Sequence, residues 1–112
     1  MASSRRERRS HRRYDSQGPV SLVDAEGRRF HGAYMKNVSE GGLFFTTPIH
    51  SLPAFGSDLE VVFTIPRSTP NTRMIEEFIA KAKVTRHQPM VDGNHAGVAL
   101  QFHQPVELML DV

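Results

Sequence analysis

Residues 59–65 read LEVVFTI, a mostly apolar run with several β-branched side chains, and Pro66 bounds it. Side chains of these types favour extended backbone, and a proline cannot donate a hydrogen bond to a strand ladder. The run therefore predicts a β-strand near the middle of the chain. The segments on either side of it divide in the same way into short apolar runs and turn residues.

Three further strand candidates precede this run. They are Val20–Val23, which follows the Gly18–Pro19 breaker, Arg28–Met35, and Leu43–Thr47, which ends at Pro48. Because Asp24–Gly27 resembles a turn, the first two candidates are predicted to form a hairpin. Asn37–Gly42, which reads NVSEGG, is rich in residues that favour turns and predicts a second one.

The segments after Pro66 are less uniform. Arg67–Arg73 is polar and contains Pro70, so an exposed loop is expected there. Met74–His87 has apolar residues at helical spacing but also an alternating pattern from Phe78 onward, and we favour a strand. A loop through Pro89–His95 follows, and Gly97–Phe102 (GVALQF) is predicted as the last strand. We expect Gln104–Val112 to form a short C-terminal helix with Pro105 near its first turn.

Six or so short strands separated by turns predict an all-β fold, namely a small antiparallel barrel. The chain has 112 residues, which suits one compact domain. We expect a flexible arginine-rich arm over residues 1–16 and a single six-stranded barrel domain over residues 17–112.

The composition excludes several classes of protein. There is no cysteine, so disulfides and thiolate chemistry are absent. No apolar run approaches the roughly 20 residues that span a bilayer, and no apolar region follows the N-terminal arginines as it would in a secretory signal. We therefore expect a cytoplasmic protein that does not insert into membranes.

Positive charge is concentrated at the N-terminal end. Residues 5–13 read RRERRSHRR, and six of these nine residues are arginine. Residues 1–13 carry a net charge of +5, so residues 14–112 sum to −3 within a whole-chain charge of +2. Because the segment has no apolar side chains to bury, it is expected to be disordered when alone. It is either a solvated tail or an arm that closes over an anionic ligand.

The NVSEGG segment also has two interpretations. Asparagine and glycine tolerate left-handed backbone angles and a serine hydroxyl bonds nearby backbone, so the segment suits a bent connection between strands. Alternatively, the Asn37 amide and the Ser39 hydroxyl offer donors and acceptors that suit the edge of a purine base. Gly42 would then remove a side chain where a flat ligand approaches.

Together the two segments resemble the PilZ domain, the bacterial receptor for cyclic di-GMP. RRSHR fits the pattern RRxxR, and NVSEGG fits the pattern D/N-x-S-x-x-G, in the order that the family has them. The resemblance extends through the following strands to GVALQF, which is similar to the closing strand of the family. It implies a six-stranded barrel with a C-terminal helix.

The resemblance also implies roles for residues at the matching positions. Arg8, Arg9 and Arg12 would clamp phosphates and stack on guanine, since guanidinium groups bind phosphate oxygens in pairs and stack on flat rings. Asn37 and Ser39 would bond a guanine edge, and Gly42 would permit close contact. No cofactor is expected besides this ligand.

Two alternatives stay open within the arginine segment. Arg5, Arg6 and Arg9 also fit RRxxR, and Arg13 could take the place of the last arginine. The residue before the motif influences whether one or two ligand molecules bind, and it is Glu7 in one register and Arg8 if the register moves by one.

Other chemistry has little support. The six histidines show no compact metal-ligand spacing, and neither a nucleophile elbow nor a P-loop occurs, so an enzyme is not expected. Arg86, at the end of a predicted strand, has two interpretations: a supplement to an anion site, or a solvent-facing arginine, which is the simpler one.

The leading hypothesis is a cyclic di-GMP receptor whose arm becomes ordered on binding. The receptor would act in trans on an unidentified protein effector of motility, exopolysaccharide or biofilm machinery. A second hypothesis is an interaction adaptor of the same fold that binds no nucleotide. A third is a small barrel that binds nucleic acid through its basic arm. The net negative body and the absence of tryptophan oppose the third, so nucleic acid is not an expected partner.

Overall fold

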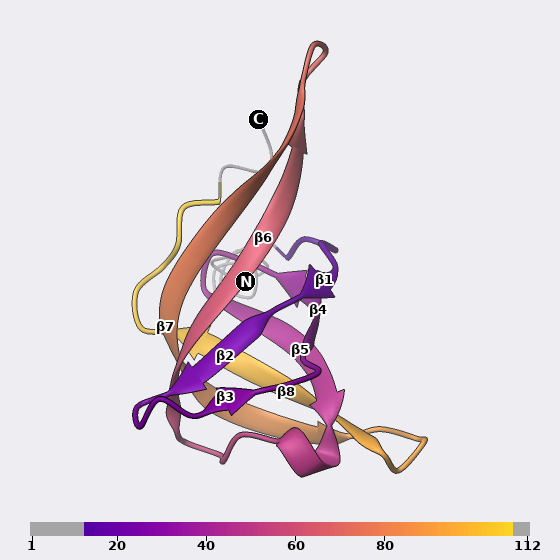
Figure 1. Cartoon of the computed structure of the whole chain (residues 1–112), viewed down its shortest axis with the longest axis vertical. Coiled ribbons are helices and arrows are strands. Elements are labelled where there is room, and N and C mark those ends of the chain that lie inside the picture. The colour runs from indigo at the N-terminus through magenta and orange to yellow at the C-terminus, as the bar shows by residue number, and fades with distance from the viewer. Residues whose placement is uncertain (1–12, 109–112) are drawn as a thin grey trace, which may run out of the picture.

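The computed structural model describes residues 13–108 of the chain. These residues form one antiparallel sheet of eight strands, in the order β1-β4-β5-β8-β7-β6-β2-β3, which curls into a half-barrel (Figure 1). The strands are β1 (Gly18–Pro19), β2 (Ser21–Asp24), β3 (Arg29–Phe30), β4 (Tyr34–Val38), β5 (Gly42–Pro48), β6 (Asp58–Ser68), β7 (Arg73–Pro89) and β8 (His95–Phe102). Within the described residues, the short 3-10 turn η1 (Ile49–Ser51) is the only helical element, so the all-β prediction is confirmed.

The strand count differs from the predicted six because two of the eight strands have only two residues, β1 and β3. The expected strand Arg28–Met35 is divided into β3 and β4. Between them Gly32 has φ +89°, a left-handed conformation that glycine tolerates, and a Cβ there would lie 2.9 Å from Cδ of Pro48. As a result β3 pairs with β2 in the predicted hairpin, whereas β4 pairs with β5 on the other side of the sheet.

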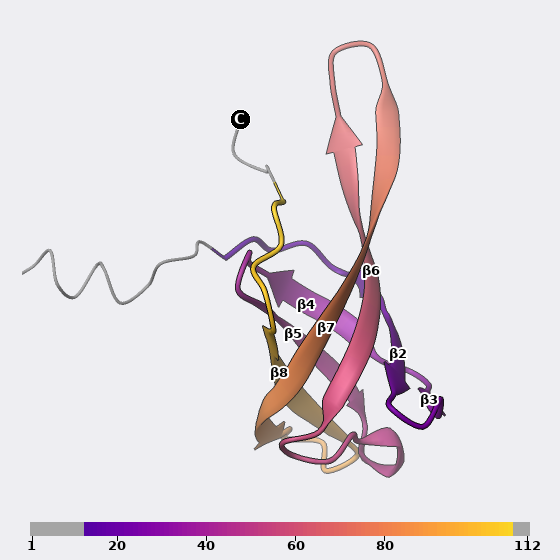
Figure 2. The same ribbon diagram turned by 90° about the vertical axis from the view of Figure 1, so that its left-hand side faces the viewer.

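The longest pairing joins β6 and β7, from Asp58 opposite Lys83 to Ser68 opposite Arg73. The end of this hairpin projects beyond the body of the sheet, as the two perpendicular views show (Figures 1 and 2). The strand interpretation of residues 74–87 is therefore confirmed. The expected loop Arg67–Arg73 is shorter than predicted, because its two ends continue the strands. Thr69 closes the remaining turn by donating its N–H to the carbonyl of Thr72 at 2.8 Å.

The predicted C-terminal helix is wrong over residues 104–108, and residues 109–112 lie outside the described part of the chain. Here the N–H groups bond to the turn before β5. Val106 donates to the Glu40 carbonyl at 2.9 Å, and Leu108 donates to the Glu40 carboxylate at 3.3 Å. Arg67 donates to the carbonyl of Leu108, whose side chain is fully buried. These contacts hold the segment extended along the sheet.

The core lies on the concave face of the sheet, and each strand of four residues or more contributes buried apolar side chains to it. Phe63 of β6 is near its centre, with 1% of its surface exposed. Its ring stacks against the rings of Phe78 and Phe102, at centroid separations of 5.3 Å and 5.9 Å. The three consecutive strands β6, β7 and β8 thus meet through one aromatic cluster.

Truncation of this cluster should lower the stability of the whole domain. We expect Phe63→Ala to reduce the free energy of unfolding in urea by about 3–5 kcal/mol, because the cavity would be lined on two sides by rings that cannot collapse into it. Phe55→Ala is the matched control. Phe55 is 69% exposed and makes an edge contact with His87, so its loss should cost about 1 kcal/mol at most. Equal losses in the two variants would contradict the placement of Phe63.

Candidate ligand-binding site

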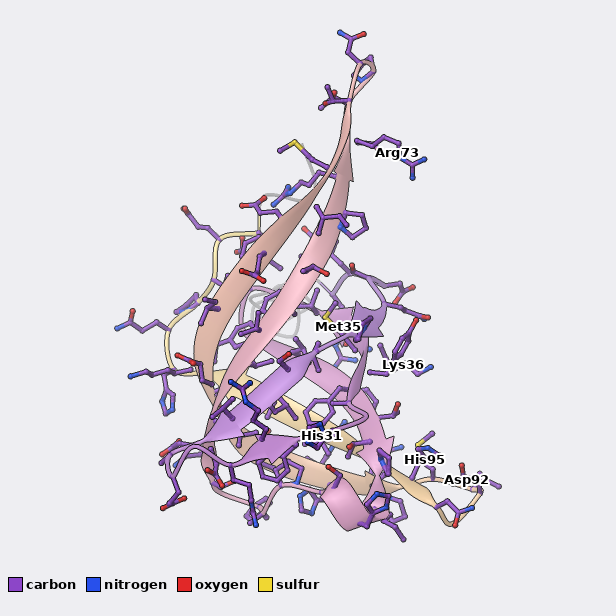
Figure 3. The ribbon with its side chains drawn as sticks, viewed as in Figure 1. His31, Met35, Lys36, Arg73, Asp92 and His95 are labelled. Carbon is purple, nitrogen blue, oxygen red and sulfur yellow. The ribbon has the colours of Figure 1, made fainter. Side chains whose placement is uncertain are left out.

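A β-bulge in β4 directs Asn37 to the outer face of the sheet. The register shifts between Met35, which faces Phe45, and Asn37, which faces Phe44. Strict alternation would have turned Asn37 toward the core together with Met35. The extra residue at the bulge is Lys36, and it restores Val38 to the core. Figure 3 shows the resulting directions, with Met35 inside the sheet and Lys36 outside it.

The turn after β4 is held by the side chain of Ser39. Its Oγ accepts hydrogen bonds from the N–H groups of Gly41 and Gly42, each at 3.2 Å. The Ser39 N–H donates to the Gly42 carbonyl at 2.8 Å. The predicted bend of NVSEGG is thus confirmed, and Ser39 has a structural use for its hydroxyl. The hydroxyl also donates to the Gly42 carbonyl at 3.5 Å, so the turn uses its proton and both of its lone pairs.

Gly42 is required by the neighbouring strand. A Cβ at this position would overlap the carbonyl oxygen of Leu100 in β8, which is backbone and cannot rotate away. The sequence suggested instead that Gly42 leaves room for a ligand. The structure adds a reason that depends on the close approach of β5 to β8, and no sequence pattern revealed that approach.

The chain before the barrel is hydrogen bonded to the same strand as Asn37. Tyr14 forms an isolated bridge with Val38, in which its N–H donates to the Val38 carbonyl at 2.7 Å and its carbonyl accepts from the Val38 N–H at 2.9 Å. Because the bridge is antiparallel, Arg13 lies on the Ser39 side of it. Arg13 is exposed. Two segments about 25 positions apart in the sequence therefore meet at the turn.

Of the four arginines predicted as site residues, the structure describes only Arg13. Arg8, Arg9 and Arg12 lie outside the described residues, so their roles stay predictions. Arg13 is described, and its position beside the turn is compatible with the alternative in which it completes the motif.

A row of four residues crosses the outer face from Asn37. Asn37 of β4 faces Phe44 of β5, Phe44 faces Ala99 of β8, and Ala99 faces Arg86 of β7. Directly opposed residues in an antiparallel sheet point to the same side, so this row is one surface. From the sequence, Arg86 was considered as a supplement to an anion site or, more simply, as a solvent-facing arginine, and Phe44 was not singled out. Only the strand register places these two residues on the same surface as Asn37.

The other ionisable side chains of the described residues do not gather into a metal site. Within residues 13–108, no group of three or more acidic or histidine side chains could hold a metal ion. The pKa of Asp92 is lowered, mainly by the N–H of Asn94 and further by the side chain of His95. These groups lie at the β7–β8 loop, where Figure 3 places Asp92 and His95 well away from Lys36. Among the described residues, no helix is long and apolar enough to cross a membrane.

Comparisons with known proteins agree with this geometry. A family model described as "PilZ domain" matches residues 7–109. A solved structure titled as the Bacillus subtilis inhibitor of motility, MotI/DgrA, superposes with a TM-score of 0.66 over 88% of the chain at 18% sequence identity. At that identity the likeness concerns the fold. The present chain spans only 44% of the length of that protein. No curated protein matches the sequence.

The contact between Gly42 and β8 can be tested by substitution. Gly42→Ala should lower the free energy of unfolding by about 1–3 kcal/mol, because the added methyl must push apart two paired strands. Gly18→Ala is the control, since no atom lies within 4 Å of a Cβ at Gly18. Both variants can be compared by urea denaturation without any ligand. A Gly42→Ala protein as stable as the Gly18→Ala protein would show that Gly42 is not needed for strand packing.

Proposed function

The chain belongs to the PilZ domain family, and we propose that it binds cyclic di-GMP at the NVSEGG turn and signals the bound state to a protein partner. The observation that carries this proposal is the bridge between Tyr14 and Val38. It ties the C-terminal end of the arginine segment to the strand that carries Asn37. Arg13, the last residue of the arginine segment, therefore lies beside the NVSEGG turn.

The residues at the turn suit one part of such a ligand. The Asn37 side chain offers two donors and one acceptor on the outer face, and these can pair with the edge of a guanine. Arg8, Arg9 and Arg12, with Arg13 as the alternative, would hold the phosphates through charge-assisted hydrogen bonds. An anionic ligand is favoured at the arginine segment because six arginines lie within residues 5–13, whereas residues 14–112 carry a net charge of −3.

The proposed output is a change of surface, since the proposed role requires no chemical step. Binding would order the arginine segment over the turn and so shift the population toward a folded-arm state. Tyr14 would act as the fixed point of that movement, because its two hydrogen bonds to Val38 do not depend on the ligand. A protein effector would then recognise the ordered arm.

We further propose that the effector belongs to motility, exopolysaccharide or biofilm machinery in a bacterial cytoplasm. The support is the shared fold with a protein titled as an inhibitor of motility.

Calorimetric titration with cyclic di-GMP tests the ligand and the turn together. The wild type should bind, and Asn37→Ala should weaken binding about tenfold or more by removing the base-edge contact. We choose Asn37 rather than Ser39 because loss of the Ser39 hydroxyl would also disturb the turn. Asn71→Ala, in the exposed hairpin loop, is the control and should bind normally. A wild type that does not bind would overturn the proposed function, and equal binding by both variants would overturn the site.

The register of the arginine motif can be decided in the same titration. If Arg8, Arg9 and Arg12 form the clamp, Arg12→Ala should lose about tenfold or more in affinity and Arg5→Ala should lose little, because a charge-assisted hydrogen bond to phosphate is removed only in the first. Arg9→Ala should be impaired in either register. The reverse order of Arg12→Ala and Arg5→Ala would favour the register that begins at Arg5.

A further inference from the structure

A second β-bulge lies at the far end of the row that begins at Asn37. In β7 the register shifts between Val84, which faces Leu100, and Arg86, which faces Ala99. Val84 is buried, so strict alternation would have pointed Arg86 toward the core as well. The bulge instead leaves both Thr85 and Arg86 exposed. Bulges of this kind re-aim side chains and are frequent beside functional sites.

The two bulges have a common result. One brings Asn37 and the other brings Arg86 to the outer face, and both residues belong to the same cross-strand row. Between them lie Phe44 and the small Ala99. The row therefore has a hydrogen-bonding amide at one end and a guanidinium at the other, with an aromatic ring between them.

The aromatic ring of Phe44 packs closely against the neighbouring strand. A Cβ on Gly97 would clash with Cζ of Phe44, so the ring lies directly against the backbone of β8. The ring is half-buried by this contact and by its neighbours, and its other side belongs to the outer face. A ring that is fixed in this way loses little further freedom when a flat group stacks over it.

Arg86 extends this aromatic surface. Its guanidinium carbon lies 6.0 Å from the centroid of the Phe44 ring. A guanidinium is planar and weakly hydrated, and it stacks on flat rings as well as bonding to anions. The pair thus offers a planar, positively charged group that lies over an aromatic ring, which suits a nucleobase that is attached to a phosphate.

From this arrangement we propose that Phe44 and Arg86 form a base-stacking subsite for the proposed ligand, separate from the base-edge contact at Asn37. One guanine of cyclic di-GMP pairs with the turn, and its second guanine stacks on the guanidinium and ring. This inference rests on the proposed function, because it assigns the second base of the same ligand. It also gives a reason for the bulge in β7, which the turn motif does not explain.

Titration of three arginine variants tests the subsite. Arg86→Ala should weaken binding of cyclic di-GMP at least about tenfold, within the range found for loss of one base stack. Arg86→Lys should lose nearly as much, because lysine keeps the charge but has no planar group to stack. Arg73→Ala is the control. It removes the same charge from the exposed end of the β6–β7 hairpin (Figure 3) and should bind as the wild type does.

Nuclear magnetic resonance gives a second readout that a purely structural role of Arg86 would not change. Ligand added to the wild type should produce ring-current shifts in the Ala99 methyl and in the Phe44 ring signals. In Arg86→Ala these shifts should shrink, while the signals of Asn37 and Gly41 still respond at saturating ligand. The thermal stability of the ligand-free variants reports separately any loss of folding.

The outcomes distinguish this inference from the proposed function. If the wild type does not bind cyclic di-GMP, both proposals fail. If the wild type binds and Arg86→Ala binds equally well, the stacking subsite alone is overturned. Normal binding by Arg86→Lys together with weak binding by Arg86→Ala would also overturn stacking, since charge alone would then explain the effect.

Discussion

The pairing of β8 with β5 on one side and with β7 on the other is the constraint on which the outer face depends. Along β5 the ladder runs without interruption from Gly42 opposite Gln101 to Pro48 opposite His95. At the Gly42 end the backbones lie so close that a Cβ at Gly42 would overlap the carbonyl oxygen of Leu100. Because this central pair is regular, the irregularities are confined to the flanking strands β4 and β7. Each of those strands has one bulge, and the two bulges face the same row.

The turn between β4 and β5 joins three parts of the chain. Val38 is hydrogen bonded to Tyr14 at the end of the arginine segment. Gly41 is bonded to Phe102, the last residue of β8, and Glu40 to Val106 in the segment that follows. A ligand that contacts Ser39 would therefore be one residue from backbone bonded to each of these parts. A change at this turn could therefore be passed through hydrogen bonds to both ends of the described chain. It would not require one part of the barrel to rotate against another.

The strands themselves were predictable where one physical cause acted alone. Leu59–Ile65 and Gly97–Phe102 lie within β6 and β8, because apolar and β-branched side chains agree there with the need for a buried face. The prediction was wrong where distant contacts intervened. Arg28–Met35 is interrupted at Gly32 beside Pro48, and the segment after Gln104 bonds to Glu40 instead of forming a helix. Neither partner is near in sequence, so local propensity could not reveal it.

The candidate site likewise has features that the sequence predicted and features that only the tertiary structure revealed. Residue order alone was enough to recognise two motifs, to expect a bend at NVSEGG and to place the charge in the arginine segment, since these depend on local chemistry. The alignment of Asn37 with Arg86 and the position of both residues on the outer face depend on strand register and on two bulges. The meeting of Tyr14 with Val38 likewise depends on the pairing of distant segments. A bulge changes the side of the sheet on which a residue lies, and no distinctive sequence pattern marks it. For that reason the residues of the outer face could be identified only from the pairing of the strands.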